Sequence, residues 1–130
     1  MKNLIKTLAL SLSVIFLAST SSMASDSKAA EKAKTAVENG APDDWKLMAT
    51  QAKKLIQRNT DMATAKAWLE SSISIKADPY NLEIMGDYYA KNNLADQAVS
   101  YYVKSINMTK AAGNSTQALQ QKLYDTKFSK

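Results

Sequence analysis

Apolar residues recur at helical spacing over residues 82–106, and this pattern constrains the fold more than any other feature of the chain. The first stripe contains Leu82, Met85, Gly86 and Tyr89, and the second contains Ala98, Tyr102, Ser105 and Ile106. Spacings of three and four residues place side chains on one face of an α-helix. Because glycine has no side chain, a second helix can approach closely at Gly86. The pattern therefore predicts two packed helices, with Gly86 in close contact with the helix that carries Ala98.

The rest of the chain is also expected to be helical, because no segment shows sustained alternation of period two. Glycines and prolines mark the expected helix boundaries: Gly40, Pro42, Pro79 and Gly113. Asp43 and Asp78 are typical N-terminal capping residues, and Pro79 is suited to the first helical position. The sequence thus predicts an all-α fold, with helices at about 43–57, 61–76, 79–91, 94–112 and 115–127.

The N-terminal residues have the composition of an export signal. Lys2 and Lys6 precede the apolar run 8–18, which is too short for a stable membrane span. Small residues in 22–24 match the positions that a signal peptidase reads, so we predict that residues 1–24 are a signal peptide cleaved after Ala24. The alternative is an uncleaved N-terminal anchor. We expect a periplasmic or secreted bacterial protein with no stable membrane span after signal removal.

Composition narrows the class of function further. Residues 25–41 are rich in Ala, Lys and Glu, which predicts a leader helix or a flexible segment. The net charge is +5, but basic and acidic residues alternate along the chain, so we expect no nucleic-acid binding. The absence of Cys excludes disulfide bonds and thiolate chemistry. The absence of His excludes His-dependent nucleophiles and His-ligated metals.

The acidic residues indicate no catalytic chemistry. Asp43 and Asp44 are adjacent at a helix start, where a capping role is expected. Glu83 and Asp87 lie four residues apart on one helix face, and ligands from one face make a poor cation site. A solvated face is the preferred interpretation of this pair. Three isolated glycines form no phosphate-binding loop. We therefore predict no catalytic residues, no metal and no cofactor.

The chain also repeats itself. Residues 91–106 match residues 58–73 at an offset of 33, so that Ala98 corresponds to Ala65. The preceding helices align through Pro42 and Pro79 at an offset of 37, which predicts about one additional helical turn in the first unit. Helix–turn–helix units with a period of about 34 residues are typical of tetratricopeptide arrays.

The second unit resembles a tetratricopeptide repeat through a large apolar, a small and an aromatic residue, then an alanine and an aromatic: Leu82, Gly86, Tyr89, Ala98 and Tyr102. The opening Asp78-Pro79 is similar to the Sel-type variant. The resemblance covers about residues 42–108 and is weaker in 42–75. It implies that residues 42–130 form a tetratricopeptide-like helical domain, in which antiparallel helical hairpins stack as a short α-solenoid with a C-terminal capping helix. A generic small helical bundle is the alternative.

The resemblance also implies that the first helix of each hairpin lines a concave groove. The partner-binding residues would then be Lys46, Thr50, Lys53, Lys54, Tyr80, Glu83, Asp87 and Lys91. This groove is basic at one end and acidic at the other, which suits a polar peptide better than an apolar ligand. The groove lacks the Lys/Asn clamp that chaperone-binding members of the family use on C-terminal carboxylates, so that function is not transferred.

The sequence thus predicts an exported, non-catalytic interaction or assembly module of the bacterial cell envelope, which binds a partner protein or peptide, or further copies of itself. The alternative is a structural subunit that self-assembles into an oligomer or filament, because a stable stack usually needs about three repeats. The six tyrosines indicate either covered helix seams or an interaction surface. A small-ligand carrier stays open if Trp45 and Trp68 enclose a cavity.

Overall fold

The computed structural model describes residues 20–129, with side-chain surroundings from residue 23 onward. Six helices follow one another along the chain: α1 (Thr20–Glu38), α2 (Trp45–Gln57), α3 (Met62–Ile75), α4 (Pro79–Lys91), α5 (Ala95–Ala111) and α6 (Gln117–Phe128). The described residues form no strand, so the prediction of an all-α fold is confirmed. No described helix combines the length and the apolar character needed to cross a membrane.

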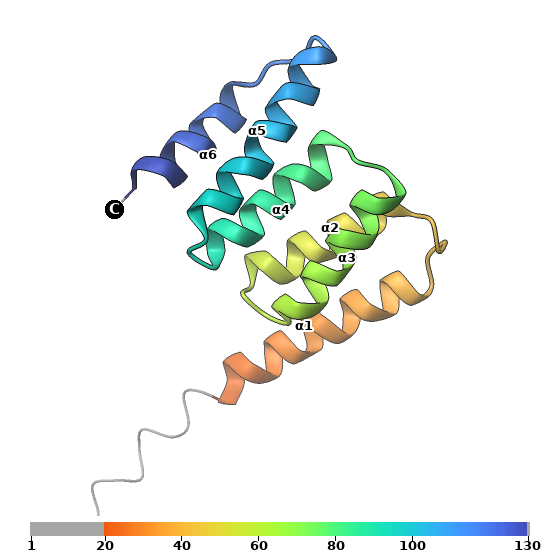
Figure 1. Ribbon diagram of the computed structural model, residues 1–130. Helices are drawn as coiled ribbons and strands as arrows, with labels where there is room; N and C mark the ends of the chain where they lie inside the picture. Colours follow the sequence, from red (N-terminus) through yellow and green to blue (C-terminus); the bar gives the residue numbers. More distant parts are fainter. Residues whose placement is uncertain (1–19, 130) are drawn as a thin grey trace, which may run out of the picture.

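Helices that are neighbours in sequence pack against one another, most extensively in the hairpins α2–α3 and α4–α5. Figure 1 shows α1 at one end of this arrangement and α6 at the other. Residues 1–19 of the predicted signal peptide lie outside the described residues, and residues 20–24 form the beginning of α1. Residues 25–38 of the predicted leader are helical, and Ala30 and Ala33 are buried in the core that α1 shares with α2.

The two hairpins share one construction, but not in the register that the prolines indicated. Asp44 and Asp78 are the N-caps of α2 and α4, and each carboxylate accepts a hydrogen bond from a backbone N–H in the first turn, at 2.8 Å and 2.9 Å. Both helices are 13 residues long, so the additional turn predicted for the first unit is wrong. The helices align at an offset of 34, and Asp44 caps α2 in place of the predicted Asp43.

The turns explain why the second helices of the hairpins align at a different offset. Asn59 and Asn93 reverse the chain after α2 and α4, with φ angles of 52° and 58°. Asparagine occupies this left-handed region more readily than most residues. The first turn contains one further residue, Asp61, which also has a positive φ of 44°. This residue changes the offset from 34 before the turn to 33 after it. The other boundaries are close to those expected: Gly113 follows α5 with φ 75°, and Thr116, not Ser115, caps α6.

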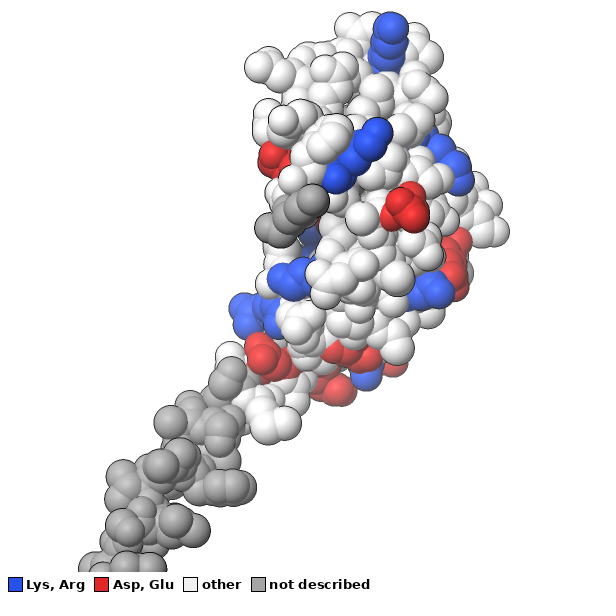
Figure 2. All heavy atoms as spheres, turned by 60° about the vertical axis from the view of Figure 1, so that its left-hand side comes forward, with Lys and Arg blue, Asp and Glu red and all other residues white. Residues whose placement is uncertain are grey.

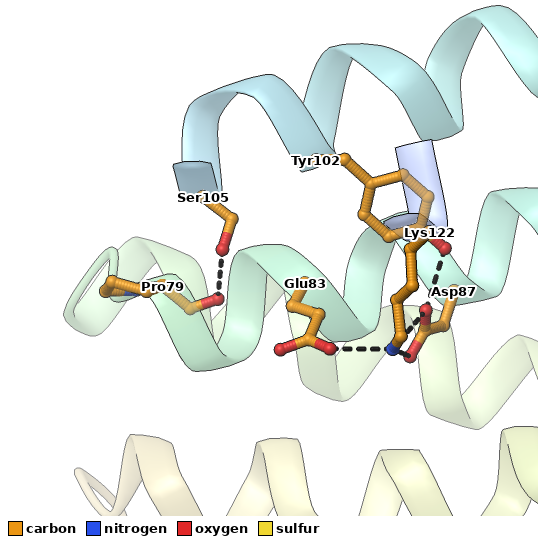
Figure 3. A network of polar contacts seen from close by, with 6 residues as sticks. All are labelled: Pro79, Glu83, Asp87, Tyr102, Ser105 and Lys122. Atoms are coloured by element: carbon orange, nitrogen blue, oxygen red, sulfur yellow. Dashed lines mark hydrogen bonds and ion pairs between the residues drawn. The ribbon is translucent and has the colours of Figure 1, made fainter. Parts of the chain in front are cut away.

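The same buried hydrogen bond joins the two helices of each hairpin. Ser72 Oγ of α3 donates to the carbonyl oxygen of Trp45 at 2.7 Å. Ser105 Oγ of α5 donates to the carbonyl oxygen of Pro79 at 2.8 Å (Figure 3). Trp45 and Pro79 are the first residues of α2 and α4, and both serines are fully buried. A buried hydroxyl needs a hydrogen-bond partner. In each hairpin this bond therefore fixes the second helix against the first residue of the first helix.

Gly86 lies against α5, and the ring that it contacts belongs to Tyr102. A Cβ atom at position 86 would lie 2.6 Å from Tyr102 Cδ1, closer than non-bonded carbon atoms approach. Tyr102 is only 2% exposed, and its hydroxyl donates to Asp87 Oδ1 at 2.7 Å. In the register of the structure, Ala52 takes the place of Gly86 and Leu69 that of Tyr102. Compared with the second hairpin, the first therefore has a larger residue on its first helix (Ala52 for Gly86) and a smaller one on its second helix (Leu69 for Tyr102).

The hydrophobic core lies between the two hairpins, and several of its buried residues are alanines. Its fully or nearly buried members include Ala49, Ala52, Leu55, Ile56, Ala65, Leu69, Ile84 and Met85. Trp68 is only partly buried and packs against this core. The buried face of α3 passes through Ala65, Leu69 and Ser72, which leaves Trp68 at its edge.

α1 is also tied to the turn of the first hairpin. Lys34 Nζ of α1 lies 3.0 Å from Asp61 Oδ2, and both side chains are partly exposed. Hydrogen bonds from Thr64 and from Lys34 hold the pKa of Asp61 below its usual value. The left-handed residue of the first turn therefore connects α1 to the start of α3.

Candidate partner-binding surface

Two hollows flank α2, one on each side. The smaller hollow, of about 210 Å³, lies between α2 and α4 and is lined by Lys53, Ile56, Gln57, Ile84, Asp87 and Lys91. The larger, of about 730 Å³, lies between α1 and α2 and is lined by Ser25, Lys28, Ala29, Lys32, Ala33, Ala36, Gln51, Lys54, Leu55, Gln57 and Arg58. Gln57 belongs to both, so one exposed ridge of α2 separates two recesses.

The α2–α4 side brings together five of the predicted partner-binding residues. Thr50 Oγ1 of α2 and the Tyr80 hydroxyl of α4 form a hydrogen bond of 3.2 Å. Lys53 Nζ lies 5.7 Å from the centre of the Tyr80 ring, within the range of a cation–π contact. Lys53, Asp87 and Lys91 line the smaller hollow. This side of α2 therefore presents basic groups beside an aromatic ring and one carboxylate.

The acidic part of the predicted groove is occupied by α6. Lys122 Nζ lies 2.6 Å from Glu83 Oε1 and 3.0 Å from both carboxylate oxygens of Asp87 (Figure 3). Burial alone would lower the pKa of Lys122, but its bonds with Glu83 and Asp87 outweigh that effect and raise it. Glu83 and Asp87 thus form an ion-pair site with Lys122 and remain only partly exposed, so they are not the free solvated face that was expected. No local pattern pointed to Lys122, which lies 35 residues beyond Asp87.

The remaining two predicted residues are not part of this arrangement. Lys54 lines the α1–α2 hollow, on the opposite side of α2 from Tyr80. Lys46 is exposed near the start of α2 and lines neither hollow. The single concave groove expected from the sequence is therefore divided by α2 itself.

The larger hollow has a basic rim and an apolar floor. Lys28 and Lys32 of α1 face Lys54 and Arg58 of α2, and all four side chains are exposed. Among the described residues that line the hollow, none is acidic. By contrast, Figure 2 shows basic and acidic side chains scattered over a mostly uncharged surface on the face that it presents. Of these four residues only Lys54 was predicted from the sequence, although each basic pair has a spacing of four residues that places it on one helix face.

The aromatic residues separate into a covered group and an exposed pair. Tyr89 and Tyr101 stack at a centroid distance of 5.5 Å, and Tyr88 meets Tyr89 edge-on at 5.2 Å, so these three cover the α4–α5 seam. Tyr124 and Phe128 of α6 contact each other but remain 59% and 57% exposed. Neither tryptophan lines either hollow, so neither recess is the tryptophan-lined cavity considered for a small ligand.

No group of three potential metal-ligating residues occurs within residues 20–129. Comparison with protein-family models, with curated proteins and with solved structures finds no match. Within residues 20–129 the fold is all-α, with six packed helices and a serine hydrogen bond that recurs in the hairpins α2–α3 and α4–α5.

Proposed function

We propose that this protein is an exported, non-catalytic interaction module of the bacterial cell envelope that binds a polypeptide segment of a partner along α2. The observation that carries the proposal is the pair of hollows on either side of this helix. Both combine apolar floors with charged rims, and recognition sites for polypeptides commonly have this composition. Of the predicted residues, Thr50, Lys53, Tyr80, Asp87 and Lys91 stay in this surface and Lys54 moves to the α1–α2 hollow, whereas Lys46 and Glu83 are left out.

Two features support a tetratricopeptide-like stack as the scaffold of this surface. The offset of 34 residues between α2 and α4 equals the typical period of such repeats. The serine bond at the start of each first helix is repeated in both hairpins. In this proposal α6 is the capping helix, because its Lys122 binds Glu83 and Asp87 of α4.

Site-specific photo-crosslinking tests the proposed function. With p-benzoylphenylalanine in place of Gln57, which borders both hollows, irradiation in cell-envelope extracts is expected to give one dominant adduct with a partner protein. The matched control carries the same group at Ser100, which is exposed on α5. Equal adduct patterns at the two positions, or none at either, would refute a binding surface along α2.

A second candidate function, self-assembly, is favoured by the exposed Tyr124–Phe128 pair at the end of the fold. If copies associate through this pair, light scattering after size-exclusion chromatography should show a mass that rises with protein concentration. Replacing both aromatic residues with Ser should abolish that rise, because exposed apolar area drives association. A constant monomer mass at all concentrations would exclude this candidate.

A further inference from the structure

We infer that the hollow between α1 and α2 binds an acidic amphipathic helix of the partner protein. This inference rests on the proposed function and specifies the chemistry of the partner. Its basis is the charge, the floor and the position of the hollow.

The rim of the hollow carries uncompensated positive charge. Lys28 and Lys32 are one helical turn apart on α1, and Lys54 and Arg58 are one turn apart on α2. Like charges at this spacing destabilise a helix. The ion pairs found within residues 23–129 involve Lys34, Lys66 and Lys122 and none of these four residues. Carboxylates supplied by a partner would relieve the repulsion on both walls at once.

The floor of the hollow is shaped for close approach of a helix. Ala29, Ala33 and Ala36 occur at spacings of four and three residues, so α1 offers a row of methyl groups. Leu55 of α2 extends this apolar floor and is 1% exposed. Gln51 lines the hollow while only 7% exposed, and its amide can both donate and accept hydrogen bonds. Small side chains shorten the distance at which two helices pack.

The position of the hollow continues the order of the helices. α4 lies on one side of α2, and Lys122 links α6 to Glu83 and Asp87 of α4. The hollow lies on the other side of α2, where a further helix would contact both α1 and α2. The α4–α6 contact also shows how charge is matched in this protein, because two carboxylates one turn apart hold one lysine. In the hollow the signs are reversed, with basic pairs ready to hold carboxylates.

Charge complementarity favours an acidic helix over α6 of a second copy of this chain as the occupant of the hollow. The described part of α6 contributes Lys122, Asp125 and Lys127, a net positive charge that matches the basic rim poorly. An acidic helix provides the complementary sign together with an apolar face for the floor.

Fluorescence anisotropy with the purified full-length protein tests the inference. The probe is a fluorescein-labelled peptide of about 18 residues, roughly five helical turns, with an Ala/Leu face flanked by Glu. The matched peptide carries Lys at every Glu position. Saturable binding is expected for the Glu peptide alone, and it should weaken as salt is raised.

Variants locate the site. Lys54→Glu with Arg58→Glu should weaken binding of the Glu peptide about tenfold or more, because two attractive contacts become repulsive. Lys104→Glu with Lys110→Glu, exposed positions on α5, makes the same change in net charge and should leave binding within about twofold. Circular-dichroism melts of both variants verify that folding is retained.

Each remaining outcome counts against the inference. It is overturned if the Glu peptide fails to bind, or if it binds the Lys54/Arg58 variant as tightly as the unchanged protein. It is also overturned if the peptide does not bind but vesicles containing phosphatidylglycerol do, and this vesicle binding is lost in the Lys54/Arg58 variant. It is also overturned if Lys54→Glu with Arg58→Glu dissolves a concentration-dependent oligomer, because a second copy then occupies the hollow. A specific adduct at position 57 together with a peptide that does not bind would leave the proposed function standing and reject this partner chemistry alone.

Discussion

Replacing Tyr102 with Ala is expected to lower the free energy of unfolding by about 3–5 kcal/mol, the usual cost of truncating a buried aromatic side chain. The Tyr102 ring is 2% exposed and fills the space left free by Gly86. Truncation leaves a cavity between α4 and α5 and removes the hydrogen bond to Asp87. Urea unfolding followed by circular dichroism measures the change. Tyr124→Ala, the same substitution at a 59% exposed site, is the control and should cost less than about 0.5 kcal/mol.

A double-mutant cycle tests the proposed contact between Gly86 and Tyr102. Gly86→Ala alone should destabilise by about 1–3 kcal/mol, because the new methyl group meets a ring that cannot move freely. In the Tyr102→Ala background the same change should be neutral or stabilise by up to about 1 kcal/mol, the helix-propensity advantage of alanine. Additive effects would contradict the contact.

Replacing Asn81 with Ala is expected to cost about 3 kcal/mol, since each buried polar group left without a partner costs roughly 1–3 kcal/mol. The Asn81 side chain is fully buried, and its Oδ1 accepts a hydrogen bond from the Asp78 N–H at 2.9 Å. Its Nδ2 donates to Ser72 Oγ at 2.9 Å and to the carbonyl oxygen of Lys76 at 2.7 Å. Because Ser72 in turn donates to Trp45, this one amide connects the ends of α2, α3 and α4.

Chemical unfolding of Asn81→Ala beside Asn107→Ala isolates this effect. Asn107 is exposed on α5, so its replacement should change stability by no more than about 0.5 kcal/mol. If the two variants unfold at the same denaturant concentration, the hydrogen-bond network does not stabilise the junction between the hairpins.

The helices and turns were predictable because their signals are local. Asp78, Pro79 and Gly113 mark boundaries through capping and backbone preferences that act within a few residues. Of the stripe from Leu82 to Tyr89, Leu82, Met85 and Gly86 are buried as expected, whereas Tyr89 is only partly buried and the buried Ile84 lies outside the stripe. Pro42 was misleading, because an X–Pro segment marks a helix boundary only approximately and Asp44 provides the cap. The alignment of α2 with α4 therefore became clear only from the hydrogen bonds of the two N-caps, Asp44 and Asp78.

The candidate site was predictable only in part. Thr50, Lys53, Tyr80, Asp87 and Lys91 do lie along the facing sides of α2 and α4, where the resemblance to a tetratricopeptide repeat implied a groove. Helical spacing states which face a residue occupies and not which neighbour covers that face. The ion pairs of Lys122 with Glu83 and Asp87 could therefore not be predicted from the sequence.

By itself, the sequence determined that this chain forms helices, where most of them begin and end, and which residues of each helix are apolar enough to be buried. Only the tertiary structure decided that α1 packs on α2 with Lys28, Lys32, Lys54 and Arg58 around one hollow. The physical reason is range. Capping and periodicity act over a few residues, whereas the meeting of two basic pairs from separate helices depends on how those helices cross, which no short segment encodes.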